Sequence, residues 1–167
     1  IIAFSIAMRA HSGSYSICFW VKPDRAQPWS SIVYITYMDG FMSLMPNSGH
    51  GDLFFRIKDD REPDEWHDLI CRPAVPGQWS YICATFDVVT HIGKLYFNGL
   101  MVGSMENMPD LKVADQILLG GDEYQDSFAG RLAGLEIYHY AVSAEVIEEK
   151  FKAYQQMPSY EGPDGRK

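Results

Sequence analysis

SYSICFWVKPD, at residues 14–24, combines β-branched and aromatic residues in one apolar run. Such residues favour a pleated, buried strand, and Pro23-Asp24 ends the run as a turn does. The stretch therefore predicts an interior β-strand, and the rest of the chain can be judged against this first element.

Strand signals of the same kind recur along the chain in short segments. They predict strands over 31–37, 41–44, 53–58, 79–86, 94–97, 100–102, 117–119 and 132–140. Two tight hairpins are expected, at Asp39-Gly40 and Asn98-Gly99, because glycine accepts a positive φ at little cost.

One segment, 143–154, has helical spacing. Ser143 is a suitable N-cap, Glu145 lies in the first turn, and apolar residues follow at helical intervals. Many short strands without βαβ alternation select a β-sandwich or jelly roll over a parallel α/β fold. We expect one domain over 1–156, and a turn-rich, charged tail or linker over 157–167.

Composition excludes several classes of partner. The formal net charge is -8, and no basic stripe offsets it, so nucleic acid and anionic lipid surfaces are not expected partners. No apolar run approaches the roughly 18 residues of a membrane span. Residues 1–8 lack the features of a signal peptide. Three cysteines are too few for a disulfide framework and leave the compartment open.

The strand blocks together resemble a known family. The blocks that carry the resemblance are SYSICFWVKPD (14–24), GQWSYICATFD (77–87), GKLYFNGLMV (93–102), ILLGG (117–121) and FAGRLAGLEIYHYAVSAEVI (128–147). In content, order and spacing they are similar to the laminin-G-like, concanavalin A-like lectin/glucanase jelly-roll family. The resemblance implies an all-β, two-sheet antiparallel β-sandwich with one short C-terminal helix, in a secreted or cell-surface protein.

The chain departs from the family pattern at two places. The family's upstream strand, with its phenylalanine, aspartate and glycine, is absent or degenerate in residues 1–13. Members often carry calcium near the sheet rim, but Ala133-Gly134 stands where the family typically has an acidic dipeptide. Calcium thus remains open as a cofactor, and no metal ligands are assigned.

Catalytic patterns are weak. Related glycoside hydrolases need two carboxylates flanking the bond, and no E-x-D-x-x-E pattern occurs. Glu136 is the only acid inside its strand, and a lone carboxylate cannot act as both acid and nucleophile. We expect no enzyme activity. The remaining alternative is a hydrolase that pairs Glu136 with Asp52 or Asp87.

Candidate ligand-binding residues lie in three expected loops. Trp66, with Asp64 and His67, interrupts the charged stretch 59–68, where it has no periodic apolar neighbours to pack with. Aromatic faces beside carboxylates suit sugar stacking and hydroxyl hydrogen bonds. Further candidates are Trp29 in its loop after Pro28, and Tyr124 and Asp122 in the glycine-rich loop 120–127. The simpler alternatives are a solvated charge cluster, a loop anchor and an exposed turn.

These patterns predict a non-catalytic recognition module that binds a glycan. The rival interpretation is a structural or protein-interaction domain that docks on a surface protein. An exposed Trp66 beside a concave polar pocket would favour the glycan, whereas a buried Trp66 and a flat apolar patch would favour protein docking. The sequence leaves the oligomeric state open.

Overall fold

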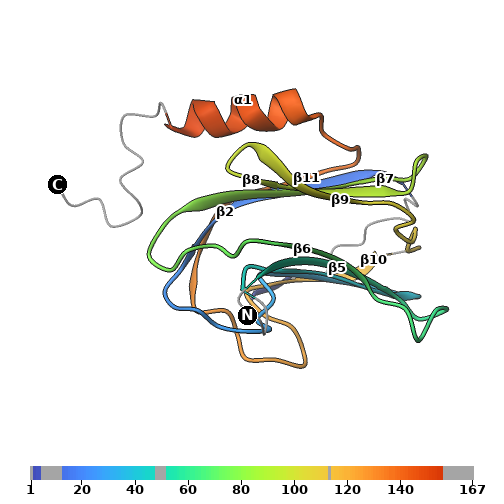
Figure 1. Cartoon of the computed structure of the whole chain (residues 1–167). Helices are drawn as coiled ribbons and strands as arrows, with labels where there is room; N and C mark the ends of the chain where they lie inside the picture. The colour runs from blue at the N-terminus through green and yellow to red at the C-terminus, as the bar shows by residue number, and fades with distance from the viewer. Residues whose placement is uncertain (1, 5–12, 48–51, 113, 156–167) are drawn as a thin grey trace.

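The computed structural model describes residues 2–4, 13–47, 52–112 and 114–155. Within them, two antiparallel sheets pack face to face and one helix lies outside the sandwich (Figure 1). The six-stranded sheet has the order β1 (Ile2–Phe4), β10 (Ala114–Leu119), β3 (Val33–Tyr37), β4 (Gly40–Met45), β5 (Leu53–Asp59) and β6 (His67–Cys71). The five-stranded sheet has the order β11 (Gly130–Tyr138), β2 (Tyr15–Pro23), β7 (Ser80–Asp87), β8 (Ile92–Phe97) and β9 (Leu100–Met105). Helix α1 spans Ala144–Gln155, which confirms the expected fold class.

Strand β2 is apolar along its length because both of its faces are covered. Ile17, Phe19 and Val21 point into the core between the sheets, and all three are fully buried. Cys18 and Trp20 point the other way, toward α1. The strand lies between β11 and β7, so the prediction of an interior strand is confirmed.

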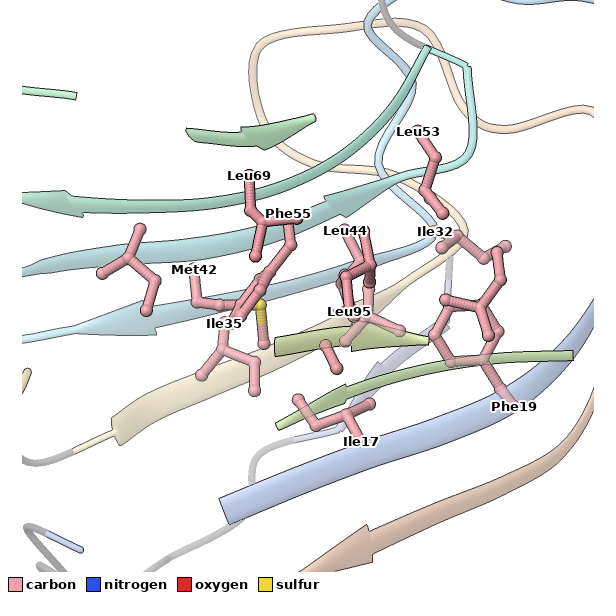
Figure 2. Close-up of a cluster of buried hydrophobic side chains, with 14 of the residues drawn as sticks. Ile17, Phe19, Ile32, Ile35, Met42, Leu44, Leu53, Phe55, Leu69 and Leu95 are labelled. Carbon is pink, nitrogen blue, oxygen red and sulfur yellow. The ribbon is translucent and has the colours of Figure 1, made fainter. Parts of the chain in front are cut away.

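The main core fills the space between the sheets. Figure 2 shows Ile17, Phe19 and Leu95 from the five-stranded sheet facing Leu44 and Phe55 from the six-stranded sheet. Each of these side chains is fully buried, and burial of a side chain of this size contributes about 1.5–3 kcal/mol. This core holds both sheets rigidly enough to position side chains on their outer faces.

A second apolar layer lies between the five-stranded sheet and α1. The Trp20 ring packs against the rings of Tyr81, Phe151 and Tyr154 at centroid distances of 5.2, 5.8 and 5.5 Å. Ile147 of α1 is fully buried in the same layer. The helix therefore covers the outer face of this sheet, as Figure 1 shows above β8 and β11.

Two of the three cysteines form a disulfide inside that layer. Cys18 of β2 and Cys83 of β7 are directly opposed in the strand register and fully buried, and their sulfurs are bonded. Cys71 is the free cysteine of the described residues, and burial raises the pKa of its thiol. The cysteine count alone did not predict this single cross-strand bond.

Both expected hairpins are present. Asn98 and Gly99 form the two-residue turn between β8 and β9, with φ values of 51° and 82°, the positive pair that such turns require. The other hairpin joins β3 to β4, and there Gly40 (φ 153°) is already paired with Tyr37. A side chain at Gly40 would meet the Lys58 carbonyl oxygen, so only glycine fits.

Two stretches differ from the sequence prediction. The expected surface loop over 59–68 ends earlier, because β6 begins at His67 and pairs with β5. The sequence does not predict this strand, because it lies at the sheet edge and Leu69 is its one buried residue, so it shows no alternating apolar pattern. At the other end, Ile2–Phe4 pairs with β10, so the degenerate upstream stretch contributes a short strand.

The predicted tail over 157–167 lies outside the described residues. Among the described helices, none has the length and apolar character needed to cross a bilayer.

Candidate functional site

The outer face of the six-stranded sheet carries a pocket of about 290 Å³. It opens on the side of the sandwich opposite α1, where two rim loops, 24–32 and 120–129, extend beneath the sheet in Figure 1. Its walls combine aromatic, charged and hydroxyl-bearing side chains, chiefly Trp29, Phe41, Arg56, Trp66, Asp122 and Tyr124.

Strand alternation places the floor of this pocket. Ile57 and Phe55 of β5 point into the core, so Arg56 between them points outward. The register sets Arg56 between Ser43 of β4 and Asp68 of β6. The pocket floor is therefore built from rigid paired strands rather than from loops.

Arg56 and Asp68 form a two-pronged ion pair. The Nε and Nη2 groups of Arg56 donate to the two carboxylate oxygens of Asp68, each at 2.6 Å. Both side chains are 18% exposed, so the pair is partly sheltered, and Arg56 lines the pocket. A bidentate pair of this kind fixes the guanidinium plane as well as its position.

Three aromatic rings surround the Arg56 guanidinium. Its central carbon lies 4.4 Å from the Trp66 ring centroid, 5.5 Å from that of Phe54 and 5.8 Å from that of Trp29. Cation–π contacts of this length are attractive and orient the rings around the charge.

Trp66 immediately precedes β6 and is 53% exposed. Its ring meets Phe41 edge-on at 6.3 Å, so the indole is braced on one side while a large apolar surface remains open to solvent.

Trp29, on the opposite rim, adopts φ 62° in the turn after Pro28 and packs edge-on against Phe54 at 6.0 Å. A non-glycine residue in this region of φ costs about 1–3 kcal/mol.

Asp122 organises the second rim loop. The carboxylate is buried and accepts the Ser31 hydroxyl at 2.5 Å and the backbone N–H groups of Tyr124 and Gln125 at 2.8 Å each. Ser31 also shares a hydrogen bond with Ser43 of β4 at 2.8 Å. Asp122 thus ties the loop to the sheet and shapes the pocket wall.

Tyr124 projects from the same loop and is 74% exposed. Its ring meets Tyr34 edge-on at 6.5 Å. Burial raises the pKa of the Tyr34 phenol, and the neighbouring Tyr124, Asp122 and Glu123 raise it further. The Tyr34 phenol is therefore protonated across the physiological pH range.

Four of the six residues predicted from sequence line this single pocket: Trp29, Trp66, Asp122 and Tyr124. The other two do not. Asp64 is exposed in the turn between β5 and β6. His67 precedes Asp68 in β6 and so faces away from Arg56; its Nε2 atom lies 3.3 Å from Glu62.

The sequence reasoning missed Arg56, Asp68 and Phe41. A signal was present in LFFRIK, where a single arginine sits inside an otherwise apolar strand. Charged residues are rarely buried unless they are paired, so such an arginine marks either an outward face or a partner. The sequence does not identify Asp68 as the partner of this arginine, because it predicts a loop where the strand that carries Asp68 lies.

The calcium ion that the family resemblance left open does not find an acidic dipeptide at its usual place. Ala133-Gly134, in place of an acidic dipeptide, lies under α1, where a side chain at Gly134 would approach the Tyr154 hydroxyl and Trp20. Both oxygens of Asp122 already accept protein hydrogen bonds. Among the described residues, Glu62, Glu65 and His67 are close enough to share an ion, but an imidazole is a poor ligand for calcium.

Glu136, the acid considered for catalysis, lies on the opposite side of the molecule from the pocket. It points from β11 toward α1, where Lys150 Nζ donates to its two oxygens at 3.1 and 3.0 Å. Of the two partners considered for it, Asp52 directly precedes β5 in the other sheet, and Asp87 ends β7 in the same sheet.

A protein-family model matches the chain's sequence, and solved structures match its fold. A family model described as the concanavalin A-like lectin/glucanases superfamily, of the laminin G type, matches residues 3–148. The chain belongs to this superfamily. No curated protein sequence matches this laminin-G-like chain.

Solved structures with the same fold include several binding domains. Domain 4 of an extracellular GH43 arabinanase from Geobacillus stearothermophilus, in complex with arabinotriose, has a TM-score of 0.70 at 23% identity, over 82% of this chain and 66% of that one. The CBM40 of a Ruminococcus gnavus sialidase, bound to α2,3 sialyllactose, has a TM-score of 0.64 at 16% identity, with 83% of each chain covered. The binding domain of botulinum neurotoxin D, in complex with N-acetylneuraminic acid, has a TM-score of 0.68 at 17% identity, over 90% of this chain and 39% of that one. The chain thus spans just under two thirds of the arabinanase domain and less than half of the neurotoxin chain.

Proposed function

We propose that this domain is a non-catalytic module that binds carbohydrate in the pocket on the outer face of the six-stranded sheet. The observation that carries the proposal is the half-exposed Trp66 ring beside the Arg56–Asp68 pair. A sugar ring stacks its C–H face on an indole, while its hydroxyls need donors and acceptors at the edge of that ring. This arrangement supplies both.

The size and shape of the pocket support the same function. Its volume of about 290 Å³ is at the small end of ligand pockets, which suits a short saccharide segment. Trp29 supports the proposal further, because a strained backbone at a pocket rim is typical of functional sites. Three structural neighbours were solved with a saccharide: arabinotriose, sialyllactose and N-acetylneuraminic acid.

We also propose that the domain works outside the cell, as part of a larger protein. The buried Cys18–Cys83 bond supports this location, because disulfides persist in oxidising compartments and are rare in the cytosol. The neighbouring arabinanase is itself extracellular by its description.

Protein docking is the second candidate. Ile70 of β6 is 53% exposed on the same face as the pocket and opposite Phe54 in the register, so an apolar strip continues beyond the pocket. Exposed apolar surface of this kind suits a protein partner.

A glycan array decides between the two candidates. Wild-type domain, Trp66→Ala and the control Leu100→Ala are applied with and without calcium; Leu100 is 65% exposed on the other sheet. We expect wild-type and Leu100→Ala to bind the same glycans without calcium, and Trp66→Ala to lose at least about tenfold in affinity. Absence of glycan binding by wild-type would favour protein docking.

A further inference from the structure

We infer that the pocket selects neutral saccharides over sugars that carry a carboxylate or sulfate, and that the Arg56–Asp68 pair determines this selectivity. The inference rests on the proposed function. It concerns which glycans are bound, and so it can fail while glycan binding itself stands.

The one cation in the pocket lining is already neutralised. Arg56 is the basic residue among the lining side chains, and its Nε and Nη2 groups are held by Asp68. An acidic sugar that replaced Asp68 in this two-pronged contact would leave a partly buried carboxylate without its cation, which is costly. An acidic sugar that accepted only from the remaining Nη1 group would place its charge beside the Asp68 carboxylate.

Lys58, a second cation close to Trp66, is also occupied. Lys58 Nζ lies 5.3 Å from the Trp66 ring centroid, but the residue is 6% exposed. Its ammonium donates to the carbonyl oxygens of Asp59 at 3.0 Å and Glu62 at 2.5 Å. Lys58 therefore points its charge into the β5–β6 turn rather than toward a bound ligand.

The pocket rim is acidic. The Asp122 carboxylate is buried, and it accepts hydrogen bonds from a hydroxyl and two backbone N–H groups, which are all neutral. Glu123 and Asp126 are exposed in the same loop. Asp122 and Glu123 also raise the pKa of the neighbouring Tyr34 phenol. An anionic sugar would be repelled, because like charges at a binding interface cost several kcal/mol.

A neutral sugar can use the ion pair without breaking it. The pairing leaves the Nη1 amino group of Arg56 outside the contact, and each Asp68 oxygen has a further lone pair. Two adjacent hydroxyls can then accept from Arg56 and donate to Asp68, beside the Trp66 ring 4.4 Å away. A vicinal diol on a flat sugar face matches this donor and acceptor pair.

The test uses matched glycan pairs on an array, each neutral glycan beside the same glycan capped with sialic acid or sulfate. We compare wild-type with Asp68→Asn, which frees the Arg56 charge, and with Asp64→Asn. The latter removes the same charge from the exposed turn without touching Arg56. We expect wild-type to prefer the neutral members by about tenfold or more.

The two variants should differ in their preference for neutral over acidic glycans. Asp68→Asn should lose or reverse the preference, whereas Asp64→Asn should keep it. A preference of wild-type for the acidic members, or equal ratios in the two variants, would overturn the inference while leaving glycan binding intact. Binding of no glycan of either kind by wild-type would overturn the proposed function as well.

A measurement on wild-type alone guards against a misfolded variant. The preference of wild-type for the neutral member of a pair should weaken between low salt and about 1 M salt, where the Debye length falls to about 3 Å and repulsion of the acidic member is screened. Affinity for the acidic member that falls steeply with salt would show that its charge is attracted, and would contradict the inference.

Discussion

Trp20 and Trp66 show how one residue type serves two purposes at the scale of single side chains. Trp20 is 7% exposed and packed among Tyr81, Phe151 and Tyr154 beneath α1. Trp66 is 53% exposed and contacts Phe41 and Arg56 on the opposite face of the sandwich. The first contributes to stability, and the second is available to a ligand.

Alanine substitution should separate these two roles. We expect Trp20→Ala to lower the free energy of unfolding by about 3–5 kcal/mol, because it removes a buried aromatic side chain. Trp66→Ala should lower it by about 1 kcal/mol or less, since half of that side chain is already solvated. Urea unfolding curves measure both. Equal losses in the two variants would contradict the placement of Trp66 at the surface.

Asp59 links stability to pH. Its carboxylate accepts the side-chain N–H groups of Arg61, which lower its pKa below the usual value despite its burial. A depressed pKa in the folded state stabilises the fold above the unfolded-state pKa near about 3.9, and that stability is lost as the pH falls through the lower folded value.

Asp59→Asn should therefore be less stable than wild-type at pH 7, and the difference should shrink as the pH drops below about 4. Urea unfolding at neutral and acidic pH gives the comparison. A difference in unfolding free energy between wild-type and Asp59→Asn that stays constant with pH would show that the Asp59 charge does not contribute to stability.

At the scale of elements, interior strands and hairpins could be predicted from the sequence, and the edge strand could not. Strand β2 has a continuous apolar run because both of its faces are covered. Asn98-Gly99 predicts the β8–β9 hairpin because these residues adopt the positive φ values that the turn requires. Strand β6 lies at an edge and begins with the polar residues His67 and Asp68, so no periodic pattern identifies it.

The same limit applies to the candidate site. Isolated aromatic residues in polar loops, such as Trp66 and Tyr124, stand out in the sequence. The Arg56–Asp68 pair depends on the register between β5 and β6, and register across a missed strand cannot be derived.

The β3–β4 hairpin offers a test at this scale. In Gly40→Ala the new Cβ would lie 2.0 Å from the Lys58 carbonyl oxygen, and the backbone has a positive φ. Gly77 also has a positive φ, but nothing lies within 4 Å of an added Cβ. Gly77→Ala should cost about 1 kcal/mol, and Gly40→Ala at least about 2 kcal/mol more, measured by thermal or urea unfolding. Equal costs would show that the close approach at Gly40 is not required.

At the scale of the whole molecule, the two outer faces of the sandwich differ in what covers them. Helix α1 and the disulfide cover the five-stranded sheet, whereas the six-stranded sheet presents its pocket between two loops (Figure 1). Stabilising groups and ligand-facing groups thus lie on opposite sides of one shared core.

Removal of the disulfide should affect stability without affecting the pocket. The bond joins cysteines separated by 65 residues, and cross-linking a loop of that length stabilises a fold by about 4 kcal/mol. We expect Cys18→Ala with Cys83→Ala to lower the free energy of unfolding by about 3–5 kcal/mol, and Cys71→Ala by about 1 kcal/mol. Glycan affinity of the folded double variant should match wild-type; a lost affinity would show that the two faces are coupled.

The central claim is that a glycan binds on the outer face of the six-stranded sheet, and indole N–H resonances test it most directly. The chain has four tryptophans, with Trp29 and Trp66 at the pocket and Trp20 and Trp79 packed in the layer beneath α1. On titration with a glycan that the array identifies, we predict that the indole signals of Trp29 and Trp66 shift while those of Trp20 and Trp79 stay in place. Shifts confined to Trp20 and Trp79 would place the ligand on the opposite face and contradict the account.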